Sequence, residues 1–387
     1  MSGSQGDRQL SVETYAVQGT REHDPETGAV IPSIDVTTTY LRDPDNGYSR
    51  GFVYGRADNA TVRRCEDVIT RLEGGRNTLV YGSGMAAATT FFLALERPAH
   101  VIAPNVMYWS LRNWLMNDAA SHGLTVSFVD ATDTGAIKEA IRPGQTKAIW
   151  LETPANPLWG ISDISMVSDA AHAVGAVVGV DATTASPVLM NPLSLGADVV
   201  MHSATKYLNG HSDVVAGSLT FAASNETQPI EDRARSHRLS LGSILGSFEA
   251  SLLLRGLRTL FVRVRAQTAS ALTIANHFDE HAAIEAVLYP GLPTAPGHTL
   301  AKSQMPGGFG GMLSIRCRGG IDHAITTAAR VQVWTRATSL GGVESLIEHR
   351  ASVEGAGTPC PDDLLRLSVG LEPAEDLIAD LEHALAR

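Results

Sequence analysis

The residues best suited to chemistry lie between Asp181 and Gly217, where a single lysine follows an apolar run. Lys206 comes after Ser203 and Thr205 in a turn rich in glycine and histidine, and Asp181 ends another apolar run about 25 positions earlier. A lysine amine that is shielded from water can stay neutral and form a Schiff base with an aldehyde. A nearby carboxylate can keep a pyridine nitrogen protonated, so that the ring accepts electrons. The pair therefore fits a pyridine-aldehyde cofactor, although a lone loop lysine is more often a solvated surface group.

A second candidate feature is the Gly-Ser-Gly turn around Ser83 and Gly84, which Met85 and an alanine-rich segment follow. Backbone N–H groups at the start of a helix bind phosphate, and neighbouring hydroxyl groups can add to such a site. Ser203 and Thr205 would supply two further hydroxyls. The segment indicates a phosphate loop, although a turn of this composition is more often only a tight connection.

The elements that must position these residues alternate along the chain. Apolar runs typical of buried strands occupy residues 78–81, 100–102, 125–129, 148–151, 176–180 and 198–201. Helical patterns occupy residues 60–72, 84–95, 112–122 and 164–174. This alternation predicts an α/β fold with a parallel sheet that helices cover on both faces. Asp181 then lies at the carboxyl end of a strand, where open α/β sheets place ligands.

The two ends of the chain have a different texture. Residues 1–57 are polar and rich in turn-formers, and they predict an extended arm that needs a surface to lie on. Residues 251–278 predict one long helix, after which a strand at 312–317 and helices near 321–335 and 374–385 are expected. We therefore predict an arm (1–57), a cofactor-binding α/β domain (58–250) and a smaller α+β domain (251–387).

The composition narrows the classes of protein to which the chain can belong. Among 387 residues, 44% are apolar and 18% are charged, as in ordinary globular proteins. The formal charge of −11 argues against nucleic-acid binding. No run approaches the ~18 apolar residues of a membrane span, and the polar start does not fit a signal peptide. Cys65, Cys317 and Cys360 are too scattered for a disulfide framework, and His202 and His211 lack metal-ligand spacing. We expect a cytoplasmic protein without nucleic-acid, membrane or metal partners.

Several motifs together resemble one enzyme family. The stretch from His202 to Tyr207, followed by Gly210-His211-Ser212-Asp213, is similar to the signature of the Cys/Met-metabolism family of pyridoxal-phosphate enzymes. That family includes cystathionine γ-synthases and lyases, methionine γ-lyases and homoserine sulfhydrylases. The other motifs occur in the family's order: Tyr54-Gly55-Arg56, Ser83-Gly84-Met85-Ala86, Glu152-Thr153-Pro154-Ala155-Asn156-Pro157, Ser339-Leu340-Gly341-Gly342 and Arg366-Leu367-Ser368-Val369-Gly370.

The resemblance implies a fold, a cofactor and an assembly. The fold is the type I, aspartate-aminotransferase-like fold, with a mostly parallel seven-stranded sheet and a smaller α+β C-terminal domain. The cofactor is pyridoxal 5'-phosphate, bound covalently to Lys206. The arm contacts a neighbouring subunit, so that the chain forms a homodimer or a homotetramer.

The resemblance also implies roles for individual residues. Tyr54 and Arg56 reach the phosphate of the neighbouring subunit's cofactor, Tyr108 stacks on the pyridine ring, and Asn156 approaches the phenolic oxygen. Lys206 is the catalytic base, and Tyr108 or Tyr54 protonates the leaving group. Further contacts to the cofactor come from Ser83, Gly84, Met85, Asp181, Thr183, Ser203 and Thr205, and the substrate is bound by Ser339 and Arg366, which takes the α-carboxylate.

Departures from the family's pattern concern the substrate. Trp109 and Leu111 are bulkier than usual, and Trp109 is equally consistent with the core or with a reshaped pocket wall. Glu348 and Arg350 bring charge near the substrate entrance, unless they lie on a helix surface, as we expect for one of them. The implied reaction is γ-elimination or γ-replacement on a homoserine derivative, cystathionine or a related amino acid, including an unusual leaving group such as that of canavanine. The alternatives are a β-lyase, a homoserine sulfhydrylase and a catalytically idle scaffold.

Overall fold

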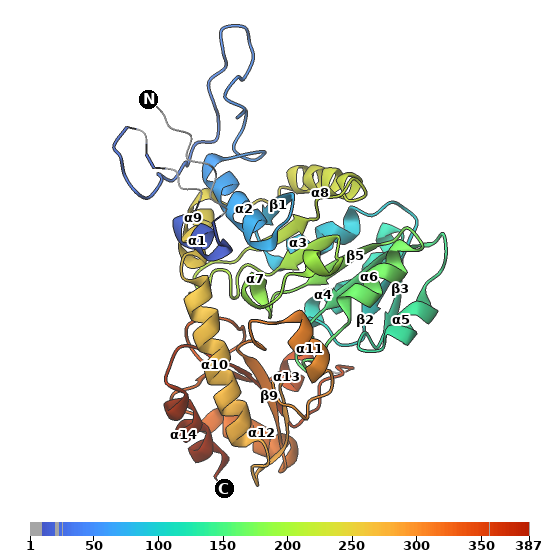
Figure 1. The fold of residues 1–387 in the computed structure, drawn as a ribbon, viewed down its shortest axis with the longest axis vertical. Helices are drawn as coiled ribbons and strands as arrows, with labels where there is room; N and C mark the ends of the chain where they lie inside the picture. The colour runs from blue at the N-terminus through green and yellow to red at the C-terminus, as the bar shows by residue number, and fades with distance from the viewer. Residues whose placement is uncertain (1–9, 20–22, 25, 356, 387) are drawn as a thin grey trace.

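A seven-stranded sheet forms the centre of the computed structural model (Figure 1). The structure describes residues 10–19, 23–24, 26–355 and 357–386. β7 alone runs antiparallel to its neighbours, so the prediction of a mostly parallel, seven-stranded sheet is confirmed. In spatial order the strands are β1 (Asn77–Tyr81), β7 (Gly217–Phe221), β6 (Val199–His202), β5 (Val177–Asp181), β4 (Thr146–Glu152), β2 (Ala99–Pro104) and β3 (Leu124–Val129).

Alternate side chains of each central strand enter two different cores, because successive residues of a strand point to opposite faces. Trp150 of β4 packs against Phe91 and Phe92 of α3, with ring centroids 5.1 Å apart in both pairs. Its neighbours Ile149 and Leu151 enter the opposite core with side chains of α5 and α6. Helices therefore cover both faces, as the apolar strands predicted. These helices are α3 (Gly84–Leu93), α4 (Trp109–Asn117) and α8 (Gln228–Leu241) on one face, and α5 (Thr134–Ala140) and α6 (Ile164–His172) on the other.

The predicted helices and strands of this region match the structure apart from their ends. Each of the six predicted apolar runs overlaps a strand, whereas the pattern does not predict β7. The predicted helix at 112–122 is α4 followed by a separate 3-10 turn, η1 (Ala119–His122). The predicted helix at 60–72 is α2 (Ala60–Glu73), and Asn59 caps it by accepting hydrogen bonds from two backbone N–H groups of its first turn.

A smaller, mostly antiparallel sheet lies beyond the large one, in the lower part of Figure 1. The predicted strand at 312–317 and helix at 374–385 are confirmed, and they are β9 and α14. The predicted helix at 321–335 is shorter, since α12 ends at Arg330 and the chain then joins the edge of the sheet as β10. In order the strands are β10 (Thr335–Arg336), β11 (Leu346–His349), β12 (Leu364–Ser368), β9 (Met312–Cys317) and β8 (Ile284–Leu288), with α12 (Gly320–Arg330) and α14 (Ala374–Leu385) packed beside them.

The prediction of one long helix over 251–278 is wrong, because two helices cover this region. These are α9 (Ser247–Leu257) and α10 (Leu260–Phe278). A Cβ on Gly256 would lie 2.2 Å from the Asn209 carbonyl oxygen, so the end of α9 lies against the backbone that follows Lys206. The Arg263 guanidinium donates to the Gly256 carbonyl at 2.9 Å. The same carbonyl accepts from the Thr259 N–H at 3.1 Å, so the Arg263 bond adds to the closure of the last turn of α9.

The N-terminal arm contains a helix that the sequence reading overlooked. α1 (Val12–Gln18) begins after Ser11, whose hydroxyl caps it by accepting from the Thr14 N–H, and Ala16 is buried against α2. Residues 23–24 and 26–57 form neither helix nor strand except at a bridge between Thr39 and Tyr54, and they project from the body in Figure 1. The arm is therefore extended only in part. The boundaries predicted at residues 57 and 250 stay predictions.

No helix in the described part of the chain has the length and apolar character needed to cross a membrane. The described residues also contain no group of three or more His, Cys, Asp or Glu side chains that could hold a metal ion.

Candidate active site

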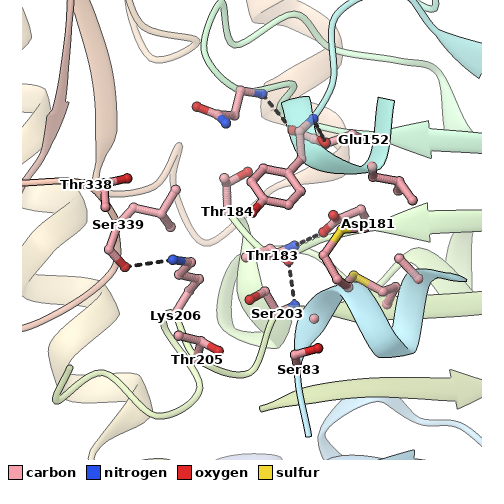
Figure 2. A pocket seen from close by; sticks show the side chains of 18 of the residues that line it. Ser83, Glu152, Asp181, Thr183, Thr184, Ser203, Thr205, Lys206, Thr338 and Ser339 are labelled. Atoms are coloured by element: carbon pink, nitrogen blue, oxygen red, sulfur yellow. Dashed lines mark hydrogen bonds between the residues drawn. The ribbon is translucent and has the colours of Figure 1, made fainter. Parts of the chain in front are cut away.

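A cavity of about 250 Å³ opens at the carboxyl ends of β4, β5 and β6 and faces the smaller sheet (Figure 2). It brings together most of the predicted site residues, although they are spread over nearly 300 positions of the sequence. The predicted residues that line it are Ser83, Gly84, Met85, Tyr108, Asn156, Asp181, Thr183, Ser203, Thr205, Lys206, Ser339 and Arg366.

Lys206 projects into this cavity from the turn that follows β6. Its Nζ donates to the Ser339 hydroxyl at 2.7 Å, and this bond crosses from the larger sheet to the smaller one (Figure 2). Burial and, to a smaller extent, the nearby Arg366 cation lower the pKa of the Lys206 amine to about 8. A substantial fraction of the amine is therefore neutral near neutral pH, as nucleophilic attack on an aldehyde requires.

The turn that carries Lys206 is fixed by the hydroxyls beside it. The Thr183 hydroxyl accepts from the Ser203 N–H at 2.8 Å, which ties the turn to the end of β5. The Thr205 hydroxyl exchanges two hydrogen bonds with the backbone of Ala216, just before β7. The roles of these hydroxyls toward a phosphate stay predictions.

Asp181 ends β5 and is buried; within the described residues it forms no ion pair with an arginine or a lysine, and His202 is a nearby basic group. Its Oδ1 accepts from the Thr183 N–H at 3.0 Å, and burial raises the pKa of its carboxyl. A buried carboxylate with no counter-ion is costly. A protonated pyridine nitrogen in the cavity would supply the missing positive charge.

The start of α3 is a part of the cavity lining that suits an anion. α3 begins at Gly84, and its N-cap Ser83 accepts from the Ala86 N–H at 3.0 Å, while the first N–H groups of any helix lack helical acceptors. A Cβ on Gly84 would lie 2.8 Å from the Ser203 hydroxyl, so only glycine allows this approach of the helix to the lysine turn. With Lys206 and Asp181, this helix start fits the aldehyde, the pyridine nitrogen and the phosphate of pyridoxal 5'-phosphate.

Glu152 is a site residue to which the sequence reading gave no role. It ends β4, lies beside Asp181 in the sheet and is buried. Its two carboxylate oxygens accept from the backbone N–H groups of Tyr108 at 2.7 Å and Asn156 at 2.9 Å (Figure 2). Burial raises the pKa of Glu152 well above its ordinary value, and the Asp181 charge adds to the rise. In the sequence, the position of Glu152 directly after an apolar run could have indicated that it belongs to the site.

Arg366 approaches the cavity from β12 of the smaller sheet. Its guanidinium donates to Asn156 Oδ1 at 3.1 Å, to the Ser339 carbonyl at 2.9 Å and to Glu348 Oε2 at 2.7 Å. Burial and, to a smaller extent, the nearby Arg350 cation lower the pKa of Arg366 to about 10. Ser339 has φ 101°, a backbone conformation that non-glycine residues rarely adopt. In that conformation its hydroxyl binds Lys206 and its carbonyl binds Arg366.

Trp109 lies in neither of the two expected positions, the buried core and the cavity wall beside Tyr108. Tyr108 and Leu111 line the cavity, and the Tyr108 side chain remains 41% exposed. Trp109 is only partly buried, and the Arg112 guanidinium lies 5.3 Å from its ring centroid. Trp109 thus belongs neither to the buried core nor to the residues found to line the cavity.

The expectation that Glu348 or Arg350 lies on a helix surface is wrong. Both are buried, because Glu348 lies on β11 directly opposite Arg366 of β12 and pairs with both arginines. Arg350 follows at the start of α13 (Arg350–Glu354) and lines the cavity.

Tyr54 and Arg56 lie outside the cavity of their own chain. Tyr54 is 48% exposed, and Arg56 donates to the Leu239 carbonyl at 2.9 Å. The Arg56 guanidinium also lies 5.7 Å from the Tyr54 ring centroid. A role at a neighbouring subunit's cofactor stays a prediction.

The sheet order, the partly buried lysine at the carboxyl edge of the sheet and the helix start at Gly84 are those expected of a pyridoxal-phosphate-dependent enzyme with the aspartate-aminotransferase-like fold. A family model described as "Cys/Met metabolism PLP-dependent enzyme" matches residues 13–386. The chain belongs to this family.

Named relatives and solved structures agree with this assignment. The chain is 41% identical to a cystathionine gamma-synthase of Mycobacterium tuberculosis over 378 residues, which cover 96% of each chain. It is 38% identical to a cystathionine gamma-lyase of Dictyostelium discoideum over 380 residues, covering 96% of this chain and 97% of the relative. A crystal structure of cystathionine gamma synthase from Xanthomonas oryzae pv. oryzae in complex with cystathionine has a TM-score of 0.91 at 36% identity and covers 98% of both chains. The predicted family, fold class and cofactor are confirmed.

Proposed function

We propose that the chain catalyses elimination or replacement at the γ-carbon of an amino acid that carries a leaving group there. The observation that carries the proposal is the placement of the Lys206 amine and the Arg366 guanidinium in one cavity, both held by Ser339. An amino-acid substrate needs both groups, because its α-carboxylate requires a cation and its α-proton requires a base. Charge-assisted, bidentate pairs of arginine with carboxylate combine strength with a defined orientation.

Each side chain then has a distinct task. Pyridoxal 5'-phosphate, carried on Lys206, supplies an electron sink that stabilises negative charge on the carbons next to the substrate nitrogen. Arg366 orients the substrate carboxylate, and the freed Lys206 amine removes first the α-proton and then a β-proton. Asp181 holds the proton on the pyridine nitrogen, and the start of α3 binds the phosphate. Tyr108, or Tyr54 from a neighbouring subunit, protonates the leaving group.

The leaving group is the finer part of the proposal. The bulky Leu111 and the buried Arg350 in the cavity wall support a substrate with an unusual oxygen- or sulfur-linked group, such as the one in canavanine. When water completes the reaction the products are 2-oxobutanoate and ammonia, or homoserine, whereas an added thiol leads to replacement.

We further propose that the enzyme is a dimer or a tetramer of two dimers. The exposure of Tyr54 and Arg56 outside their own cavity supports this assembly. The cytoplasmic location stays a prediction.

A substrate screen tests the reaction. Purified holoenzyme is mixed with O-acetylhomoserine, O-succinylhomoserine, cystathionine, methionine and canavanine, with and without cysteine, and the products are identified by mass spectrometry. Lys206→Ala is the control without the base. Formation of 2-oxobutanoate, homoserine or cystathionine by the parent enzyme alone supports the proposal. Pyruvate as the sole keto acid from cystathionine would establish a β-lyase instead, and a colourless protein inactive on every substrate would support an idle scaffold.

A further inference from the structure

Four buried charged side chains form a continuous chain that begins at the cavity and enters the smaller sheet. Glu348 Oε2 accepts from Arg366 at 2.7 Å and from Arg350 at 2.9 Å. Arg350 also donates to Glu354 Oε1 at 2.7 Å. The side chains of all four are at most 8% exposed. Positive and negative groups alternate along the chain, so each carboxylate touches at least one guanidinium.

The β-sheet register places the first pair in this chain. Glu348 and Arg366 are directly opposite each other on β11 and β12, and residues in such positions share one face of the sheet. Arg350 and Glu354 are four positions apart at the two ends of α13, where one helical turn brings side chains together. The arrangement therefore follows from local backbone geometry at each step.

The sharing of Glu348 has a consequence for Arg366. Three of the five N–H donors of Arg366 are used by Asn156, Ser339 and Glu348, so a substrate carboxylate must share this guanidinium with them. Glu348 competes with that carboxylate because it carries the same charge. Arg350 draws on the same Glu348 oxygen and so weakens this competition.

We propose that Arg350 is a positioning residue that acts through Glu348 to keep Arg366 available for the substrate's α-carboxylate. This inference rests on the proposed role of Arg366. Without Arg350, the whole charge of Glu348 faces Arg366, and the substrate carboxylate meets a guanidinium that is already neutralised. Arg350 thus sets affinity for the carboxylate end of the substrate without bonding to it.

The test measures binding of L-norvaline, which has an α-carboxylate but no γ-leaving group, to the holoenzyme by calorimetry. Arg350→Met should raise its dissociation constant about tenfold or more, the size of effect expected for one charge-assisted hydrogen bond. Butylamine lacks the carboxylate, and its dissociation constant should change less than about twofold. Arg316→Met is the matched control. Arg316 also forms an ion pair on the same sheet but lies away from the cavity, so its loss should leave both dissociation constants unchanged.

The double variant Glu348→Gln with Arg350→Met decides how Arg350 acts. Removing the competing charge should restore norvaline affinity to within about threefold of the parent, because the effects of coupled residues are not additive. If Arg350→Met has no effect, or if the double variant binds as weakly as Arg350→Met alone, the inference is wrong. Should Arg350→Met not fold, Arg350→Gln with and without Glu348→Gln poses the same question, because glutamine also removes the positive charge. If Arg366→Met leaves norvaline affinity unchanged, it is the proposed role of Arg366 that fails.

Discussion

Replacing Arg366 with glutamine should raise the pKa of the Lys206 amine and slow its reaction with an aldehyde at neutral pH. The pKa of Lys206 lies at about 8 instead of its ordinary 10.5, chiefly because of burial and next because of the Arg366 cation. At pH 7 about one amine in ten is then neutral, against roughly one in 3,000 for an ordinary lysine, a gain of about 300-fold. Loss of Arg366 should move this pKa back toward its ordinary value, and each pKa unit recovered would lower the fraction of neutral amine about tenfold.

The assay follows the visible absorption that appears when apoprotein is mixed with saturating pyridoxal 5'-phosphate between pH 6 and pH 10. The rate for the parent protein should rise with a midpoint near pH 8, and the midpoint for Arg366→Gln should lie higher. Lys206→Ala keeps the other three lysines, Lys138, Lys147 and Lys302, and so measures the background reaction. A parental midpoint above pH 10, or an unchanged midpoint in Arg366→Gln, would refute the reasoning.

Four further predictions concern stability, the cofactor site and assembly. Lys206→Met should stabilise the apoprotein by at most about 3 kcal/mol below pH 8. Because the pKa of Lys206 is lower in the folded than in the unfolded protein, this gain should shrink as the pH rises toward 10.5. Urea unfolding at pH 7 and pH 9.5 measures the gain, and a larger gain at pH 9.5 would contradict the prediction. Glu152→Gln can accept only one of the two backbone N–H groups that Glu152 binds, so turnover should fall about tenfold or more in steady-state assays; an unchanged rate would count against a role in placing the cavity wall. Gly84→Ala brings a Cβ to 2.8 Å from the Ser203 hydroxyl, so cofactor retention on dialysis should weaken, and full retention would contradict the close approach. In a hybrid of an Arg56→Ala chain with a Lys206→Ala chain, the site that keeps Lys206 should receive the intact Arg56 of the other chain and retain the cofactor, whereas weak retention at that site would disprove the predicted cross-subunit contact.

Much of the larger sheet could be predicted from the sequence, because strands buried on both faces are continuous apolar runs. β7 escaped prediction because it begins with the small residues Gly217 and Ser218 instead of a run of large apolar side chains, and Gly217 packs closely against the backbone of Ser83. The break between α9 and α10 escaped for a related reason. The apolar pattern continues through it, whereas its cause is the packing of Gly256 against a loop distant in sequence.

Some residues of the candidate site could be predicted from local sequence, whereas others depend on partners from distant segments. Lys206 and Asp181 could be predicted because Asp181 ends one apolar strand and Lys206 lies in the turn after another, and the position of a strand end is local information. The partnership of Glu348 with Arg366 depends on the register of β11 against β12, which the order of residues does not reveal. Charged residues such as these are usually exposed, so their burial required knowledge of their partners. Glu152 is similar, since its role follows from two backbone N–H groups supplied by other segments.

Lys206 belongs to a turn of the larger sheet, whereas Arg366 belongs to a strand of the smaller one, and Ser339 joins them. Turnover therefore requires the parts of the molecule that contain the larger and the smaller sheet to keep the relative position in which these hydrogen bonds form. Inactivation should precede unfolding, because a slight loosening of this contact separates Lys206 from Arg366 while the helices and strands remain folded. Low concentrations of urea should abolish turnover while the far-ultraviolet circular dichroism of the protein stays unchanged.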